Sequence, residues 1–402
     1  MTRAKARADD KALRHARRLL DRHPVIDGHN DLAWVIRNRP TAPGDVEAYD
    51  LRKRTAGDTD LARLAEGRVG GQFWSVYVPG DAKAEGFARL QLEQIDIARR
   101  VIARHAERLQ LCFGTADIER ARRRRRIASL LGMEGGHAIE NSLGALRLFY
   151  ELGARYMTLT HNVSHDWADA ALDTARHGGL SRFGEEVVRE MNRLGMLVDL
   201  AHVSPDVMAH ALDVSEAPVV FSHSSCRALT DVPRNVPDAI LGRLRTNGGV
   251  VMITFVAPFV SREVATAYAA GMIEVRKRTH GITDRPERRR IERDYFAAHP
   301  LPRATIGQVA DHVEHARRVA GTDHIGIGGD YDGNDDWPVG LEDVSGYPNL
   351  FAELIRRGWK DGELARLARG NLLRAFRRAE AAARRLRRMR PPSAARIDAP
   401  TA

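Results

Sequence analysis

Histidines and carboxylates recur along this chain directly after short apolar runs. The first example is the stretch VIDGHND at residues 25–31, which places His29 and Asp31 two positions apart. Residues i and i+2 of an extended segment project to the same side, so both side chains can enter one pocket. An imidazole and a carboxylate are good ligands for a divalent metal ion. Taken alone, the pair also fits a turn histidine beside a helix-capping aspartate.

Five further groups of the same kind follow later apolar runs: Glu134, His161, His202, His223 and Asp330. The whole set exceeds the needs of a single catalytic zinc, which takes three protein ligands and a water molecule. A site with two metal ions accounts for more of these residues than a site with one. We expect His29 and Asp31 to bind one metal ion. His202 and His223 then bind the other, and Glu134 bridges the two.

Such a pair of metal ions predicts hydrolytic chemistry. Two ions can share a hydroxide, lower its pKa toward neutrality and polarise a scissile carbonyl. Asp330 is placed to take the proton of the water and give it to a leaving amine. Asp332 is a close rival for this role, because spacing alone barely separates the two. Zinc is the first choice for a set of histidines and carboxylates, although manganese or cobalt fits similar ligands.

Four other polar residues have plainer interpretations. His137 and His165 are expected in loops or as hydrogen-bond partners of the ligands. Asp27 and Asp199 stand inside apolar runs, where each can hydrogen-bond a ligand or the neighbouring backbone.

Eight runs of strand character supply the elements that position these groups. They lie at 24–28, 70–79, 127–133, 155–160, 196–201, 218–222, 249–255 and 325–329. Helical stretches separate most of them, which predicts an α/β protein with a (β/α)8 TIM barrel. The apolar runs suit parallel strands covered on both faces. In such a barrel the C-terminal strand ends converge on one rim, so groups far apart in sequence become neighbours.

Residues 1–390 are expected to form a single catalytic domain, followed by a flexible tail at 391–402. A lead-in helix is predicted at 9–22, and closing helices are predicted at 348–357, 361–369 and 371–390. A long charged insertion occupies residues 261–300, after the seventh strand. It is either a solvated excursion or a lid or dimer contact that reaches over the rim.

Composition argues against several other classes of protein. The net charge of +10 comes with arginine runs at 122–126, 288–290 and 384–390, but acids are plentiful between them. Because no nucleic-acid-binding motif accompanies the charge, solvated surface is favoured over nucleic-acid binding. Cys112 and Cys226 cannot form a disulfide framework. With no long apolar run and no secretory signal at 1–22, we expect a cytoplasmic protein that makes no membrane contact.

The candidate residues stand in sequence blocks that resemble those of the membrane (renal) dipeptidases. The matching blocks are 25–32, 71–77, 134–137, 159–162, 199–204, 221–225, 234–238 and 328–333. They follow one another in the expected order from about residue 24 to about residue 376. The similarity therefore covers nearly the whole chain.

This resemblance implies a binuclear zinc peptidase with an amidohydrolase-type, metallo-dependent hydrolase barrel. It implies cleavage of dipeptides with a free C-terminal carboxylate, the same five metal ligands, and Asp330 as the proton shuttle. His161 would contact the polarised carbonyl of the substrate. Arg234 would hold the substrate carboxylate, which suits a guanidinium because it offers two parallel donors. The resemblance also suggests a homodimer.

Some features depart from the anchored animal members, which carry a signal peptide, disulfides and a hydrophobic C-terminal tail. None of these is evident here, so the membrane part of the family name is not carried over. Three alternatives stay open: dipeptides with a C-terminal D-residue, N-acyl amino acids, or another small amide or lactone at the same site. A further hypothesis is a non-catalytic or nucleic-acid-binding barrel, suggested by the arginine runs.

Overall fold

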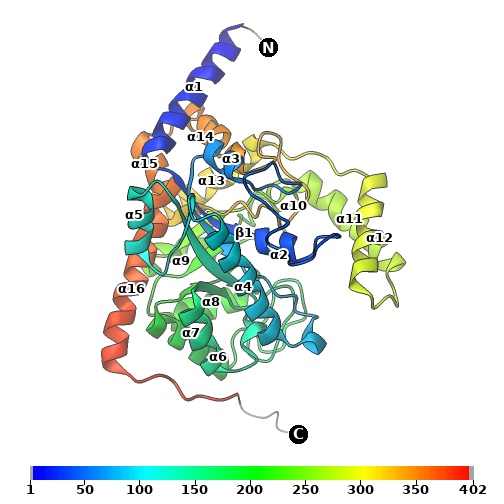
Figure 1. Ribbon diagram of the computed structural model, residues 1–402, viewed down its shortest axis with the longest axis vertical. Helices are drawn as coiled ribbons and strands as arrows, with labels where there is room; N and C mark the ends of the chain where they lie inside the picture. Colours follow the sequence, from blue (N-terminus) through cyan, green and yellow to red (C-terminus); the bar gives the residue numbers. More distant parts are fainter. Residues whose placement is uncertain (1–2, 398–402) are drawn as a thin grey trace.

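A closed barrel of eight parallel strands forms the centre of the protein, whose computed structural model describes residues 3–397 (Figure 1). Around the ring the order is β1, β9, β8, β7, β6, β5, β4 and β2, and β2 pairs again with β1. The bounds are β1 (Val25–Asn30), β2 (Val69–Ser75), β4 (Ile127–Glu134), β5 (Ala154–Thr158), β6 (Leu197–Asp199), β7 (Val220–Ser224), β8 (Val250–Ile253) and β9 (Ile325–Ile327). The predicted (β/α)8 barrel is confirmed.

One short strand was not predicted. It is β3 (Leu109–Leu111), which pairs with the first half of β4 from Leu109 opposite Ile127. The second half of β4 pairs with β5 instead.

Helices cover the outside of the barrel (Figure 1). Between the strands they are α4 (Phe87–Arg104), α5 (Thr115–Arg123), α6 (Leu143–Leu152), α7 (Arg182–Leu194), α8 (Pro205–Val214), α9 (Asp238–Asn247) and α13 (Ile306–Ala320). Several begin at a serine whose hydroxyl accepts a hydrogen bond from the third helical amide, namely Ser142, Ser181 and Ser204. Such a cap satisfies an amide that has no partner within the helix and fixes where the helix leaves its loop.

Two glycines allow β1 and β9 to approach β7, with which neither strand is paired. A Cβ atom at Gly28 would lie 2.4 Å from the carbonyl oxygen of Ser222, and one at Gly328 would lie 1.8 Å from it. Both distances are far below van der Waals contact, so any larger residue would push β1 or β9 away from β7. The glycines thereby bring the rim ends of these strands together.

Buried Asp27 ties the first strand to its neighbours. Its carboxylate accepts hydrogen bonds from the amides of His29 and Gly329, the side chain of Gln72 and the hydroxyl of Tyr347. Asp27 was expected to hydrogen-bond either a metal ligand or the neighbouring backbone, and its bonds to two backbone amides support the second role. It holds β1 in register beside the ligand-bearing rim.

Helix α16 (Asn371–Met389) closes the end of the barrel opposite the rim. Its side chains Leu372, Phe376 and Ala379 pack in one apolar cluster with strand residues that include Leu130 and Val250. At the other end of the chain, α1 (Arg3–Arg22) packs against α14 (Tyr347–Arg356), and α15 (Asp361–Ala365) follows. Beyond α16, the backbone and hydroxyl of Ser393 hydrogen-bond with α6 and α7.

The charged insertion forms a helical hairpin that projects from the barrel (Figure 1). After the short α10 (Ala257–Val260), it consists of α11 (Arg262–Arg278) and α12 (Arg285–Ala298). The two helices meet through the stacked rings of Tyr268 and Phe296, whose centroids are 5.3 Å apart. None of the helices in residues 3–397 combines the length and apolar character needed to cross a membrane.

Candidate metal centre and active site

The barrel rim brings together all seven histidines and carboxylates predicted to share a site. His29, Glu134 and His223 belong to strands β1, β4 and β7 themselves, because all three strands run past their predicted ends. The others lie in the first residues after their strands: Asp31, His161, His202 and Asp330. The five predicted metal ligands are buried, whereas His161 and Asp330 remain partly accessible.

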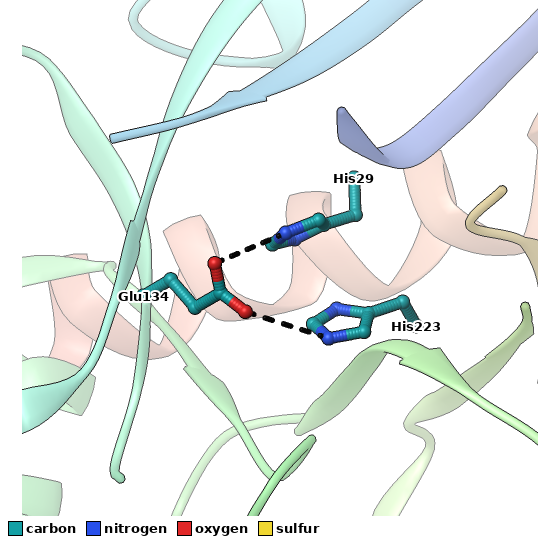
Figure 2. Close-up of side chains that lie close together, drawn as sticks. All are labelled: His29, Glu134 and His223. Atoms are coloured by element: carbon teal, nitrogen blue, oxygen red, sulfur yellow. Dashed lines mark ion pairs between the residues drawn. The ribbon is translucent and has the colours of Figure 1, made fainter. Parts of the chain in front are cut away.

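The two carboxylate oxygens of Glu134 face different candidate ligands. Its Oε2 lies 3.3 Å from Nε2 of His29, which is itself 3.2 Å from a carboxylate oxygen of Asp31. Its Oε1 lies 3.0 Å from Nε2 of His202 and 3.6 Å from Nε2 of His223. Figure 2 shows the carboxylate between His29 and His223, with one oxygen turned to each ring. The bridging role of Glu134 between two metal ions stays a prediction, and it requires the two oxygens to face different ligands as they do here.

Asp31 is free to act as a ligand. It occupies the N-cap position of α2 (Leu32–Arg37), but its side chain makes no capping hydrogen bond. The carboxylate turns instead toward Nε2 of His29. The alternative interpretation, a helix-capping aspartate, therefore does not account for its position.

Each ligand histidine is oriented through its other ring nitrogen. Nδ1 of His29 lies 2.8 Å from the hydroxyl of Tyr156, which donates to the carbonyl of Gly28 at 3.1 Å. Because the hydroxyl proton is used there, Nδ1 of His29 carries a proton and donates to Tyr156. Nε2 of His29, which has no hydrogen-bond partner, then keeps a lone pair directed into the site.

His223 and His202 follow the same rule. Nδ1 of His223 lies 2.8 Å from the hydroxyl of Ser222, and that hydroxyl donates to Asp199 at 2.6 Å. Nδ1 of His202 donates to the side-chain oxygen of Asn162 at 2.9 Å. Both rings therefore direct an Nε2 lone pair inward. Asp199 thus acts through Ser222 on a ligand, one of the two roles open to it.

The converging lone pairs create a candidate site for a cation. Nε2 of His202 and Nε2 of His223 are only 2.8 Å apart, a distance at which two lone pairs repel each other. Three overlapping sets of ligand atoms could each hold a metal ion: His29 with Glu134 and His223, Glu134 with His161 and His202, and His29 with Asp31 and Asp330. The donor set of neutral imidazoles and carboxylates fits a divalent transition metal.

The pKa shifts of three of the four histidines at the site agree with this assignment. Burial lowers the pKa of His161, His202 and His223 well below its ordinary value, so these rings are neutral as metal ligation requires. Burial also raises the pKa of Glu134, and Asp31 adds to that rise. For His29, burial opposes protonation, but Tyr156 and the nearby carboxylates raise its pKa overall. A buried cluster of carboxylates beside neutral imidazoles is stabilised by a positive ion.

His161 and Asp330 approach the centre from opposite sides. They follow β5 and β9, which stand across the ring from each other. Nε2 of His161 lies 3.8 Å from Glu134, and Oδ1 of Asp330 lies 3.8 Å from Nε2 of His29. Asp330 has a backbone φ of +68°, in the left-handed region that non-glycine residues rarely adopt. Such strain is typical of functional sites, where the surrounding structure holds a side chain in place.

Arg234 is a buried cation beside this centre. Its Nη1 is buried without a hydrogen-bond partner, and the guanidinium lies 5.3 Å from the ring centroid of Phe259. Burial lowers the pKa of Arg234 to about 10, partly offset by Asp330 and Glu134. Unused donors on a buried guanidinium favour an anionic ligand, preferably a carboxylate that accepts two parallel bonds.

Comparison with known proteins identifies the family. Residues 13–390 match the model of membrane dipeptidase, peptidase family M19. The chain belongs to this metallo-dipeptidase family. Dipeptidase 3 of Mus musculus is 40% identical over 378 residues, which cover 93% of this chain and 68% of the mouse protein. Dipeptidase 3 of Homo sapiens is 40% identical over 370 residues, with 91% of this chain and 67% of the human protein covered.

Solved structures show the same fold. A dipeptidase AC of family M19 has a TM-score of 0.72 at 25% identity, covering 89% of this chain and 98% of its own. The probable dipeptidase PvdM from Pseudomonas aeruginosa has a TM-score of 0.80 at 22% identity, covering 93% of this chain and 99% of its own. A metallopeptidase from Rhodobacter sphaeroides, liganded with a phosphinate mimic of L-Ala-D-Ala, has a TM-score of 0.73 at 24% identity, covering 89% and 99%.

The structure of this M19 enzyme separates Asp330 from its rival. Asp332 exchanges hydrogen bonds with Asp58. Each carboxylate accepts the backbone amide of the other residue, at 2.7 and 2.9 Å. Asp332 therefore anchors a loop, whereas Asp330 faces the site.

His137 and His165 hydrogen-bond the backbone of rim loops. Each donates through Nε2 to a backbone carbonyl at 2.9 Å, of Val78 and Leu159 respectively. Burial lowers the pKa of His137 to about 4 and that of His165 to about 3. Both are neutral rings that hold rim loops near the ligands.

The orienting groups Tyr156, Ser222 and Asn162 were not predicted from the sequence. Tyr156 and Thr158 alternate on one face of β5, and this alternation is a signal that they point into the barrel. Ser222 directly precedes a ligand, and Asn162 directly follows His161.

We expect Ser222→Ala to weaken zinc binding by roughly 10-fold to 100-fold, the usual effect of removing a group that orients a ligand histidine. Without the hydroxyl, Nδ1 of His223 loses its acceptor and the link to Asp199. Zinc affinity can be measured by competition with a chromophoric chelator. Ser224→Ala is a matched control, because the Ser224 hydroxyl on the same strand has no hydrogen-bond partner. Equal zinc affinity in the two variants would contradict the orienting role.

Proposed function

We propose that this enzyme is a binuclear zinc dipeptidase that hydrolyses dipeptides with a free C-terminal carboxylate. The observation that carries the proposal is the position of Glu134, whose Oε2 faces His29 and whose Oε1 faces His202. When bound, two zinc ions would lower the pKa of the attacking water and polarise the scissile carbonyl.

Three residues of the chain bind the substrate and transfer the proton. Arg234 binds the C-terminal carboxylate and so places the peptide bond over the ligand cluster. His161, above the cluster, contacts the carbonyl oxygen of that bond. Asp330 accepts the proton released by the attacking water and delivers it to the leaving amine, so that cleavage of the peptide bond yields two free amino acids.

The substrate range extends in this proposal to dipeptides with a C-terminal D-residue. Support comes from the metallopeptidase of Rhodobacter sphaeroides, which was solved with a phosphinate mimic of L-Ala-D-Ala. N-acyl amino acids and other small amides or lactones remain the alternative substrates for the same site.

We also propose that the enzyme acts in the cytoplasm on small peptides, without nucleic acid as a partner. Both cysteines, Cys112 and Cys226, are buried and free, which is compatible with a reducing compartment. The homodimer suggested by the family stays a prediction.

A library of dipeptides with L- or D-residues at each position tests the function, with two equivalents of zinc added to the enzyme. We expect hydrolysis of free dipeptides and much slower hydrolysis of N-acyl amino acids. If zinc-loaded enzyme cleaves no dipeptide yet cleaves N-acyl amino acids, the alternative is correct. If it cleaves neither and binds DNA with a steep salt dependence, the enzyme is not a dipeptidase.

A further inference from the structure

Helix α12 of the insertion lies against the rim of the active site. The guanidinium of Arg289 is 5.3 Å from the ring centroid of Trp34, which belongs to the short α2 directly after Asp31. Arg285 fixes the start of the helix through a 2.6 Å ion pair with Asp81, in the loop after β2. Figure 1 shows α12 on the same side of the barrel as α2. The insertion is thus tethered at the rim through Arg285 and Arg289.

A row of aromatic rings connects Arg289 with the ligand cluster. The ring of Trp34 meets that of Tyr77 edge-on at 4.8 Å, and Tyr77 lies 4.6 Å from the ring of His161. All three side chains are partly exposed, so they form an accessible wall. The wall begins at a residue that contacts the substrate and ends beneath Arg289.

The charge of Arg289 is available to a ligand. Two other arginines of α12 pair with carboxylates, Arg285 with Asp81 and Arg290 with Glu287. Within residues 3–397, Arg289 has no carboxylate at ion-pair distance, and it is exposed. A guanidinium that stacks on an aromatic ring still presents its donors at its edge, where a carboxylate can accept two of them.

Barrel topology places this wall opposite Arg234. Arg234 follows β7, whereas Tyr77 follows β2, and the ring order sets β7 and β2 across from each other. A dipeptide that has its carboxylate on Arg234 and its peptide bond over the cluster extends its N-terminal residue toward Trp34 and Tyr77. This step rests on the proposed function, which assigns the carboxylate to Arg234.

We propose that Arg289 is a specificity-determining residue that favours dipeptides with an acidic N-terminal residue. Its guanidinium pairs with the side-chain carboxylate of that residue, while Trp34 covers the methylene groups of the same side chain. The N-terminal glutamyl dipeptides are the substrate class that fits both contacts.

The test compares kcat/KM for Glu-Ala and Gln-Ala, two substrates of equal shape that differ in one charge. We expect the zinc-loaded enzyme to prefer Glu-Ala by about fivefold, the effect of a well-placed ion pair that remains accessible to solvent. Arg289→Gln should bring the ratio to about one, and Arg289→Glu should reverse it. Arg290→Gln, a change of the same kind on the same helix, should leave the ratio at its wild-type value.

Two results would overturn the assignment: a wild-type ratio near one, or a ratio that Arg289→Gln leaves unchanged. Hydrolysis of Leu-Ala separates this failure from failure of the proposed function. If Leu-Ala is cleaved while the Glu-Ala to Gln-Ala ratio is one, only the role of Arg289 is wrong. If no dipeptide is cleaved, including Leu-Ala, the proposed function fails and the role of Arg289 fails with it.

Discussion

Asp330→Asn is expected to lower kcat for dipeptide hydrolysis by roughly 10²-fold to 10⁴-fold, the range for loss of a general acid–base group. The carboxylate of Asp330 faces the ligand cluster from the side opposite His161, 3.8 Å from Nε2 of His29. An amide of the same shape can neither accept nor release the proton that the reaction transfers. We expect KM and the metal content to stay close to those of the wild type. Steady-state kinetics and elemental analysis measure these quantities.

A matched control is Asp335→Asn, which changes an exposed aspartate of the same loop. It should retain wild-type kcat. A variant Asp330→Asn with kcat within twofold of the wild type would refute the shuttle. A fall in its metal content would instead make Asp330 a ligand.

Arg234→Met should raise KM for free-carboxylate dipeptides by about 100-fold. Two charge-assisted hydrogen bonds from a buried guanidinium are worth roughly 3 kcal/mol, which corresponds to that factor. Methionine keeps most of the side-chain volume but offers no donor and no charge. A dipeptide amide never uses the pair of bonds, so its KM should change little. The two substrates are compared by steady-state kinetics on the same enzyme preparation.

The control for this experiment is Arg243→Met. Arg243 pairs with Asp213 on the outer surface, at the far end of the barrel from the rim. It should show wild-type KM for both substrates. Equal losses for the free and the amidated dipeptide in Arg234→Met would show that Arg234 supports the fold of the site and does not bind the carboxylate.

Much of the site could be predicted from the sequence because each ligand stands at the end of an apolar run. Runs that are buried on both faces identify parallel strands, and parallel strands in a barrel share one rim. That rule alone brings Glu134 and His223 together, although 89 positions separate them in sequence. The family resemblance added the roles of His161 and Arg234, which strand ends alone do not distinguish from other rim groups.

The features that could not be predicted depend on which strands face each other in the barrel and on the local backbone conformation. The hydrogen bond from His29 to Tyr156 crosses the barrel between β1 and β5, so no local sequence pattern predicts it. His202 and Asp330 both have positive φ values, and neither is a residue type that signals a left-handed backbone as glycine does. The insertion is similar: its charge pattern predicts exposure, but only the fold places Arg289 over Trp34.

The metal content of Asp31→Ala tests the two-metal site most directly. Asp31 belongs to the group on one side of Glu134 and makes no helix-capping bond, so its loss should remove one metal ion without unfolding the barrel. After zinc loading and removal of unbound metal, elemental analysis should find two zinc ions per wild-type chain and one per variant chain, with unchanged circular dichroism. Two zinc ions in the folded variant, or a single one in the wild type, would contradict the account.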